Sequence, residues 1–357
     1  MQRIIKRLTY YLFALLVVGQ TACLDTIEID VPTIFENGLV IQGGLIRHSD
    51  KARVIVQFRS VSDEKSQSNV IRVQNAYVHN DLGQSKELIL DVDGFYKTMF
   101  EDSINFNYSF GRSFYVKVTT YNGDQFISEP EILSNSPAIE SLSWKKVKKS
   151  IVNNLNQVEL ADFVEIYLTS PKPEGLNYLK FDVINAYQYT DQLEGFPPGK
   201  LCYVTQRADT RNVLLYDHTS LAEPVIKDIP VYDHRIDYLF SEGYYGTIVL
   251  QSIGKKAYDY YTQINELNNR EGSIYDAPAG RVISNIKNMT HPDQDAYGFF
   301  YAVSQDTARI SIQPEEVGNP SRQCPVPPSE TSPCPVRFCC DCLTINGAKL
   351  EKPWYWQ

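Results

Sequence analysis

Residues 113–128 read SFYVKVTTYNGDQFIS, and this stretch decides the fold class. From Ser113 to Tyr121 apolar or aromatic side chains alternate with polar ones, which is the pattern of a strand with one buried face. Asn122-Gly123 follows, and this dipeptide favours a tight turn because both residues tolerate positive φ. The stretch therefore predicts an antiparallel hairpin.

Short strand-like runs and turns continue on the N-terminal side of this hairpin. One turn, Asp91-Val92-Asp93-Gly94, also resembles the start of a calcium loop, but Asp102 stands where that loop needs a glutamate. A hairpin turn explains it better. We predict an Ig-like or carboxypeptidase-regulatory-like β-sandwich over residues 36–135, ending where Pro130 and Pro137 break the pattern. Its strand-like runs are 39–44, 52–58, 70–79, 86–90 and 113–121.

Residues 136–320 form the predicted second domain, which is also rich in strands. One helix interrupts them at residues 255–269, where Ala257, Tyr261, Ile264 and Leu267 recur on a single face. That face should pack on the second sheet. The predicted fold class is therefore mostly β, with two β-sandwich-like domains, one helix packed on the second, and a Cys-rich and Pro-rich C-terminal tail over residues 321–357.

The composition excludes several classes of protein. The chain has 357 residues, of which 43% are hydrophobic and 22% charged, as in a globular protein. Its formal net charge of −9 becomes about −12 once the three basic residues of the leader described below are removed, which argues against nucleic-acid binding. No Gly-rich nucleotide loop, zinc-protease motif or nucleophile elbow occurs, so the sequence predicts no cofactor.

Residues 1–22 are typical of a lipoprotein signal peptide. Three basic residues precede an apolar run, residues 8–18, that is too short for a membrane-spanning helix. The following Gly-Gln-Thr-Ala-Cys sequence resembles the lipobox of bacterial lipoproteins, with Gln20 where Leu is usual. We expect acylation of Cys23, a lipidated tether over residues 23–35, and lasting attachment to the lipid bilayer through several acyl chains.

Two further patterns resemble features of Bacteroidetes surface proteins. Asp25, Glu28 and Asp30 follow the expected lipidated Cys, which resembles the signal that exports lipoproteins of that phylum to the cell surface. Three tripeptides also resemble its O-glycosylation acceptors, although ordinary turn and strand residues would explain them. The acceptor hydroxyls would belong to Thr26, Ser103 and Thr307.

Six cysteines remain after Cys23, and an even number favours disulfides in an exported chain, with 15 possible pairings. The alternative is a structural zinc site in the tail, where four of the cysteines lie close together but no histidine is near. Cross-links should tie the tail to the body, because the Pro-rich stretch 325–335 cannot form regular structure. The disulfide candidates are Cys202, Cys324, Cys334, Cys339, Cys340 and Cys342.

The histidines, lysines and tyrosines that could form a binding or metal site have simpler structural explanations. Two Tyr-Asp-His triplets end at His218 and His234, but adjacent strand residues point to opposite faces and no third ligand follows in a recognisable spacing. We therefore predict no metal site. Four lysines within residues 145–149 are expected to form a solvated face. Tyr-rich segments at 178–189 and 258–261 could stack on glycans or peptides, but packing of sheet and helix explains them more simply.

Four motifs of the second half resemble, in their order and spacing, an uncharacterised family of Bacteroidetes lipoproteins known only as a domain of unknown function. They are YDYY (258–261), GSIYDAP (272–278), SNIKN (284–288) and YGFF (297–300), and the tail motif PWYW (353–356) departs slightly from the family pattern. Members of the family tend to be encoded beside TonB-dependent outer-membrane receptors. The resemblance therefore implies a location and a partner, and it implies no activity.

We accordingly predict a lipid-anchored outer-membrane protein, at the cell surface or on the periplasmic face, that serves a TonB-dependent receptor as a binding or assembly subunit without being an enzyme. The alternative is a surface hydrolase or a glycan-binding lipoprotein. An enzyme should show converging polar groups with perturbed proton affinities in one cleft, whereas an accessory subunit should show an apolar or aromatic patch. The expected receptor contacts are Tyr258, Tyr261, Tyr275, Tyr297 and Phe299.

Overall fold

The computed structural model describes most of the chain after the expected leader and tether. The described residues are 38–61, 69–102, 104–135, 138–173, 178–191, 199–270, 282–322 and 336–356. Within these ranges the strands form three sheets of eleven, six and three strands. The predicted mostly β fold class is confirmed.

The largest sheet has the strand order β20-β14-β13-β17-β19-β1-β2-β7-β6, and two short strands, β15 and β3, pair with β13 and β2 beside this path. Its strands are β1 (Gly38–His48), β2 (Lys51–Val61), β3 (Asn69–Val70), β6 (Ile89–Leu90), β7 (Tyr96–Phe100), β13 (Tyr178–Thr190), β14 (Leu201–Arg207), β15 (Leu214–Asp217), β17 (Tyr244–Ile253), β19 (Tyr297–Ile312) and β20 (Ala348–Lys349).

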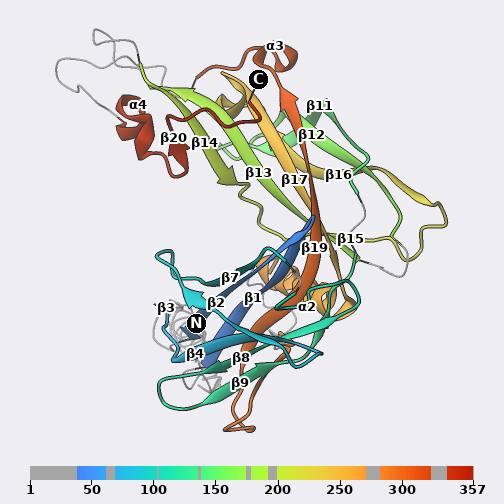
Figure 1. The fold of residues 1–357 in the computed structure, drawn as a ribbon. Coiled ribbons are helices and arrows are strands. Elements are labelled where there is room, and N and C mark those ends of the chain that lie inside the picture. Colours follow the sequence, from blue (N-terminus) through green and yellow to red (C-terminus); the bar gives the residue numbers. More distant parts are fainter. Residues whose placement is uncertain are drawn as a thin grey trace, which may run out of the picture. The chain divides into compact units, whose positions relative to one another are not determined.

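Two smaller sheets accompany it (Figure 1). One contains β4 (Asn75–Asn80), β5 (Ser85–Glu87), β8 (Ser113–Thr119), β9 (Gln125–Ser128), β10 (Glu131–Ile132) and β18 (Ile286–Asn288). The other contains β11 (Ser141–Val152), β12 (Val158–Pro171) and β16 (Val225–Arg235). The described helical segments are α2 (Lys255–Asn268), α3 (Pro314–Val317), α4 (Arg337–Cys340) and the 3-10 turns η1 (Tyr238–Phe240) and η2 (Cys342–Thr344).

Both hairpins expected from turn chemistry are confirmed. β8 and β9 pair antiparallel around the Asn122-Gly123 turn, where Gly123 has a φ of 89°. β6 and β7 pair antiparallel around the Asp91–Gly94 turn. Lys97 forms ion pairs with both Asp91 and Asp93, so these carboxylates have an ammonium partner. The hairpin explanation of that turn is the correct one.

Strand β19 connects the regions that we predicted as separate domains. Its residues 297–304 run parallel to β1, and its residues 305–312 run antiparallel to β17. β18, which also follows residue 136, pairs with β9. Strands from the second predicted domain thus complete sheets of the first, while the boundary near residue 135 itself stays a prediction.

One face of the largest sheet is covered by two hydrophobic cores. Even-numbered residues of β19 point to this face, so Phe300 lies in the first core and Ile312 in the second. In the first core, β1 and β2 pack against apolar side chains of β4 and β8, such as Val78 and Val116. In the second, β13 and β17 pack against alternate residues of β12, among them Ile166. The opposite face of the sheet carries helix α2.

Helix α2 packs on that opposite face, as predicted. Ala257 and Tyr261 are buried in a third core with Phe299 and Val303 of β19, and Ile264 packs at its edge. Helix propensity matters little here, because tertiary packing of one face holds the helix. The confirmed helix ends one residue earlier than predicted, at Asn268. No helix among the described residues is long and apolar enough to cross a membrane.

The tail is tied to the body by a disulfide and by packing. Cys342 forms a disulfide with Cys202 of β14, with 6.0 Å between their Cα atoms, and β20 pairs with β14 beside it. Trp356 is 8% exposed and contacts the rings of Tyr203 and Tyr245. The expected cross-link between tail and body is therefore confirmed for this pair.

Candidate functional site

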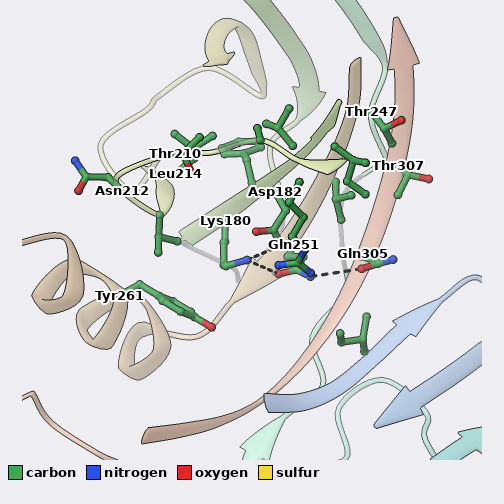
Figure 2. A pocket seen from close by; sticks show the side chains of 18 of the residues that line it. Lys180, Asp182, Thr210, Asn212, Leu214, Thr247, Gln251, Tyr261, Gln305 and Thr307 are labelled. Atoms are coloured by element: carbon green, nitrogen blue, oxygen red, sulfur yellow. Dashed lines mark hydrogen bonds and ion pairs between the residues drawn. The ribbon is translucent and has the colours of Figure 1, made fainter. Parts of the chain in front are cut away.

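A cavity of about 500 Å³ lies on the face of the large sheet that carries helix α2. Side chains from β1, β2, β13, β14, β17 and β19 line it, and α2 together with residues 210–214 completes its wall. Figure 2 shows side chains from neighbouring strands converging on the cavity, with Tyr261 projecting from α2 toward the strands. Pockets that hold small ligands typically enclose roughly 300–1,000 Å³, so this cavity has a suitable size.

The strand register explains why these particular side chains meet. Paired residues of neighbouring strands point to the same face of a sheet, and so do residues two apart along one strand. Three cross-strand rows result, and every residue in them lines the cavity. They are Gln305–Gln251–Lys180, then Thr307–Val249–Asp182, then Arg309–Thr247–Ile184–Arg207.

The first row contains a buried ammonium group with two partners. Lys180 is 8% exposed, and its Nζ donates to Asp182 Oδ2 at 2.6 Å and to Gln251 Oε1 at 3.2 Å. Gln251 Nε2 in turn donates to Gln305 Oε1 at 3.4 Å (Figure 2). A buried charge is costly unless it is paired and hydrogen-bonded, and this row supplies both conditions. The network fixes the polar side chains of the floor.

Positive charge exceeds negative charge around the cavity. Five cationic side chains line it against one carboxylate, although acidic residues outnumber basic ones 43 to 34 in the whole chain. The carboxylate is Asp182, which already pairs with Lys180. The cations are Arg53, Lys180, Arg207, Arg211 and Arg309.

Two of the four arginines are occupied by the protein itself. Arg211 donates to the carbonyl oxygen of Asn268 at the C-terminal end of α2, at 2.8 and 2.6 Å. Arg309 lies over the ring of Tyr355, 4.4 Å from its centroid. Arg53 and Arg207, by contrast, have no hydrogen bond or ion pair with any residue that the structure describes.

Two tyrosine hydroxyls complete the polar lining. Burial raises the pKa of Tyr301 to about 12, and Asp182 acts in the same direction. The charges of Arg207 and Arg53 oppose that rise. Burial also raises the pKa of Tyr261. Both hydroxyls therefore remain protonated at neutral pH and can donate hydrogen bonds into the cavity.

Gly44 makes room for one of these rings. A Cβ atom at this position would lie 2.5 Å from Cδ2 of Tyr301 and 2.1 Å from its carbonyl oxygen. β1 and β19 can therefore approach closely with the ring of Tyr301 across Gly44, and any larger residue would displace it.

The proposed receptor contacts occupy several kinds of environment. Tyr261 and Phe299 are buried, at 8% and 2% exposure, and the ring of Phe299 packs 5.0 Å from that of Tyr260. Tyr258 is half-buried and lies 4.3 Å from the ring of Tyr178. Tyr297 is half-buried at the start of β19, and Tyr275 lies outside the described residues. Contact of these residues with a receptor stays a prediction.

Some of the cysteine and glycosylation candidates lie among the described residues, and the others lie outside them. Cys202 and Cys342 form a disulfide, and Cys339 and Cys340 each take part in a disulfide as well. Thr307 is half-buried and lines the cavity, and its glycosylation stays a prediction. The remaining candidates, Cys23, Thr26, Ser103, Cys324 and Cys334, lie outside the described residues.

The two histidines of the Tyr-Asp-His triplets have different neighbours. His218 is 1% exposed, and burial lowers its pKa, with Lys172 acting in the same direction. His234 is half-buried, and its Nδ1 lies 2.6 Å from the carbonyl oxygen of Arg235. Within the described ranges no three His, Cys, Asp or Glu side chains gather in a way that could hold a metal ion.

The lysines of residues 145–149 are mostly exposed, and three of them form ion pairs. Lys146 and Lys148 pair with Asp162, and Lys149 pairs with Glu165. Trp144 packs against the second core. Lys146 and Lys148 point to the side of the three-stranded sheet that carries Asp162, and Lys145 and Lys149 point to the side that carries Glu165, so the lysines do not form a single face.

Sequence reasoning missed the charged lining of the cavity. Lys180 and Asp182 stand at alternate positions of the otherwise apolar run 178–184, and this alternation was the available signal. Arg53 and Arg207 could not be recognised as site residues from the sequence, because arginines are common at exposed positions of strands.

The structure thus shows a mostly β protein with a cavity of about 500 Å³ whose lining is rich in cationic side chains. The chain belongs to the family described as a domain of unknown function, DUF4249, whose match covers residues 25–309. No curated protein and no solved structure matches the chain significantly.

Proposed function

We propose that this protein is a lipid-anchored accessory subunit of a TonB-dependent receptor system at the outer membrane, where it binds a small ligand without catalysis. The observation that carries the binding role is the polar cavity of about 500 Å³ with its excess of cationic side chains. The lipobox-like sequence ending at Cys23 supports the membrane anchor. The resemblance to lipoproteins encoded beside such receptors supports the choice of partner.

The convergence of polar groups in one cavity meets the criterion given above for an enzyme, but the direction of the pKa shifts and the small number of carboxylates favour binding over catalysis. A tyrosine that serves as a base or nucleophile needs a lowered pKa, whereas burial raises the pKa of both Tyr261 and Tyr301. Cleavage of glycosides by paired carboxylates needs two of them, and Asp182 is the only carboxylate among the described residues that line the cavity. These groups are suited to hold a ligand by hydrogen bonds.

The alternative function, a surface hydrolase or a glycan-binding lipoprotein, rests on the same cavity. Polar groups do converge there, and the amides and hydroxyls of Gln251, Gln305 and Thr247 suit a hydroxyl-rich ligand. The hydrolase form of this alternative requires that Asp182 act as the acid or base.

Co-purification tests the proposed function. The native lipoprotein, captured from outer membrane solubilised in mild detergent, should bring down a TonB-dependent receptor identified by mass spectrometry, since lasting interfaces typically bury on the order of 1,600 Å². The Cys23→Ala variant should leave the membrane pellet for the soluble fraction, because one acylated N-terminus is the only proposed anchor.

Two outcomes would contradict this function. The first is a Cys23→Ala variant that still pellets with the outer membrane. The second is isolation of the lipoprotein without a receptor, together with hydrolysis of a glycan or peptide that Asp182→Asn abolishes. The second outcome would establish the enzyme alternative.

A further inference from the structure

We infer that the cavity binds a small polar molecule through an oxyanion group, a carboxylate or a phosphate, held between Arg53 and Arg207 beside the hydroxyls of Tyr261 and Tyr301. This inference rests on the proposed binding function and specifies its ligand class.

The charge of the two arginines is not neutralised by the described protein. Asp182, the carboxylate of the lining, pairs with Lys180, so it does not balance a guanidinium as well. Both side chains are exposed, so water screens their charges, and an anion in the cavity would take the place of that water as their partner. This local surplus of cations lies in a chain with an excess of acidic residues.

The two guanidinium groups come from distant strands and line the same cavity. Arg53 belongs to β2 and Arg207 to β14, which lie on opposite sides of β19 in the strand order. Both lower the pKa of Tyr301 against the effect of burial, and Arg207 also acts on Tyr261. An anion beside these hydroxyls would meet two cations and two neutral donors.

Guanidinium groups select the chemistry of that anion. Their planar fork of N–H donors matches the paired oxygens of a carboxylate or phosphate, and such charge-assisted hydrogen bonds are stronger than neutral ones. The tyrosine hydroxyls donate and, being protonated at neutral pH, carry no competing negative charge. A cationic ligand would meet repulsion from the same groups.

The cavity is larger than an isolated oxyanion requires. Its floor continues through Gln251, Gln305, Thr247 and Thr307, whose amides and hydroxyls can both donate and accept. The ligand therefore combines one oxyanion group with further polar groups, such as hydroxyls, that bond along the floor.

Calorimetric titration of the full mature lipoprotein in mild detergent tests this inference with three probes of similar size. Glucuronate carries a carboxylate, glucose 6-phosphate carries a phosphate, and glucose is the neutral control. We expect saturable binding of at least one anionic probe, with glucose at least tenfold weaker. Binding of glucuronate alone would identify the carboxylate as the source of the oxyanion, and binding of glucose 6-phosphate alone would identify the phosphate.

Variants connect the binding to the named groups. Arg53→Gln and Arg207→Gln should each weaken binding of the anionic probe about tenfold or more, as loss of a charge-assisted hydrogen bond implies. Tyr301→Phe should weaken it as well while keeping its ring across Gly44. Arg235→Gln is the matched control, because Arg235 is an exposed arginine on β16 that pairs with Glu159 away from the cavity. Its affinity should equal that of the wild-type protein.

The inference is overturned if neither anionic probe binds, if glucose binds as tightly, or if both arginine variants, shown to be folded by their unfolding temperatures, bind like the wild type. Its failure can be separated from failure of the proposed function. Absence of a co-purified receptor with intact anion binding would remove the receptor role alone, whereas a co-purified receptor without anion binding would remove the ligand class alone.

Discussion

Replacing Glu131 with glutamine should stabilise the protein above pH 7 and remove a loss of stability that the wild-type chain shows as pH rises. Glu131 lies in β10, and 9% of its surface is exposed. Burial raises the pKa of its carboxyl from 4.5 to about 7, although the charge of Lys256 and a hydrogen bond from Asn285 favour the ionised form. The folded protein therefore keeps a proton that the unfolded chain releases.

The direction of the effect follows from proton linkage. Between pH 4.5 and about 7 the native state binds more protons at Glu131 than the unfolded state, so stability falls as pH rises through this window. A shift of that size corresponds to about 3 kcal/mol in the free energy of unfolding. This contribution is lost fully above the pKa of the folded state. Because glutamine has a similar shape and no charge, Glu131→Gln should be about 3 kcal/mol more stable than the wild type at pH 8 and nearly equal to it at pH 4.

Urea denaturation followed by far-ultraviolet circular dichroism at pH 4, 6 and 8 measures this difference. Glu129→Gln is the matched control two residues away, because hydrogen bonds from Lys256 and Lys287 hold the pKa of the Glu129 carboxyl below its usual value. That variant should lose stability at pH 8 rather than gain it. Equal stability of Glu131→Gln and the wild type at pH 8 would refute the conclusion that burial of this carboxylate destabilises the fold.

Two further predictions concern the second core and the tail. The double variant Cys202→Ser, Cys342→Ser removes the disulfide and should lower the free energy of unfolding by about 5 kcal/mol, because the bond closes a segment of 140 residues. An unchanged unfolding temperature under non-reducing conditions would contradict this. Tyr244→Phe should cost about 1–3 kcal/mol in urea denaturation, because the Tyr244 hydroxyl donates to Oδ1 of buried Asn185 at 2.7 Å. A loss below about 0.5 kcal/mol would show that another donor replaces it.

Local sequence patterns predicted the parts of this fold that local physics determines. The turn at Asn122-Gly123 and the alternation of residues 113–121 specify a hairpin by themselves. The spacing of Ala257, Tyr261, Ile264 and Leu267 likewise indicated which face of α2 would pack, although Leu267 is not part of the third core and buried Tyr260 was missed. Both kinds of signal span fewer than about a dozen residues, so they could be recognised without knowing the sheet.

Pairing between distant strands could not be predicted in this way. β1 lies parallel to β19 with Val40 opposite Tyr297, although more than half of the chain separates them. Periodicity gives the face of each strand but says nothing about its neighbour. The candidate site was missed for the same reason, because Arg53 and Arg207 meet only when β2 and β14 occupy their places on either side of β19.

The position of the cavity follows from the way β19 exchanges partners. β1 accompanies it to Ser304 on one edge, and β17 accompanies it from Gln305 on the other edge, so the sheet is staggered at that point. Tyr301 and Thr307 stand on either side of the exchange and both line the cavity. A shift of one residue in either pairing would turn the affected side chains to the opposite face. The oxyanion site thus requires both pairings at once, and a protein whose two halves dissociated at β19 would lose Arg53 and Arg207 from a common site while each hairpin remained folded.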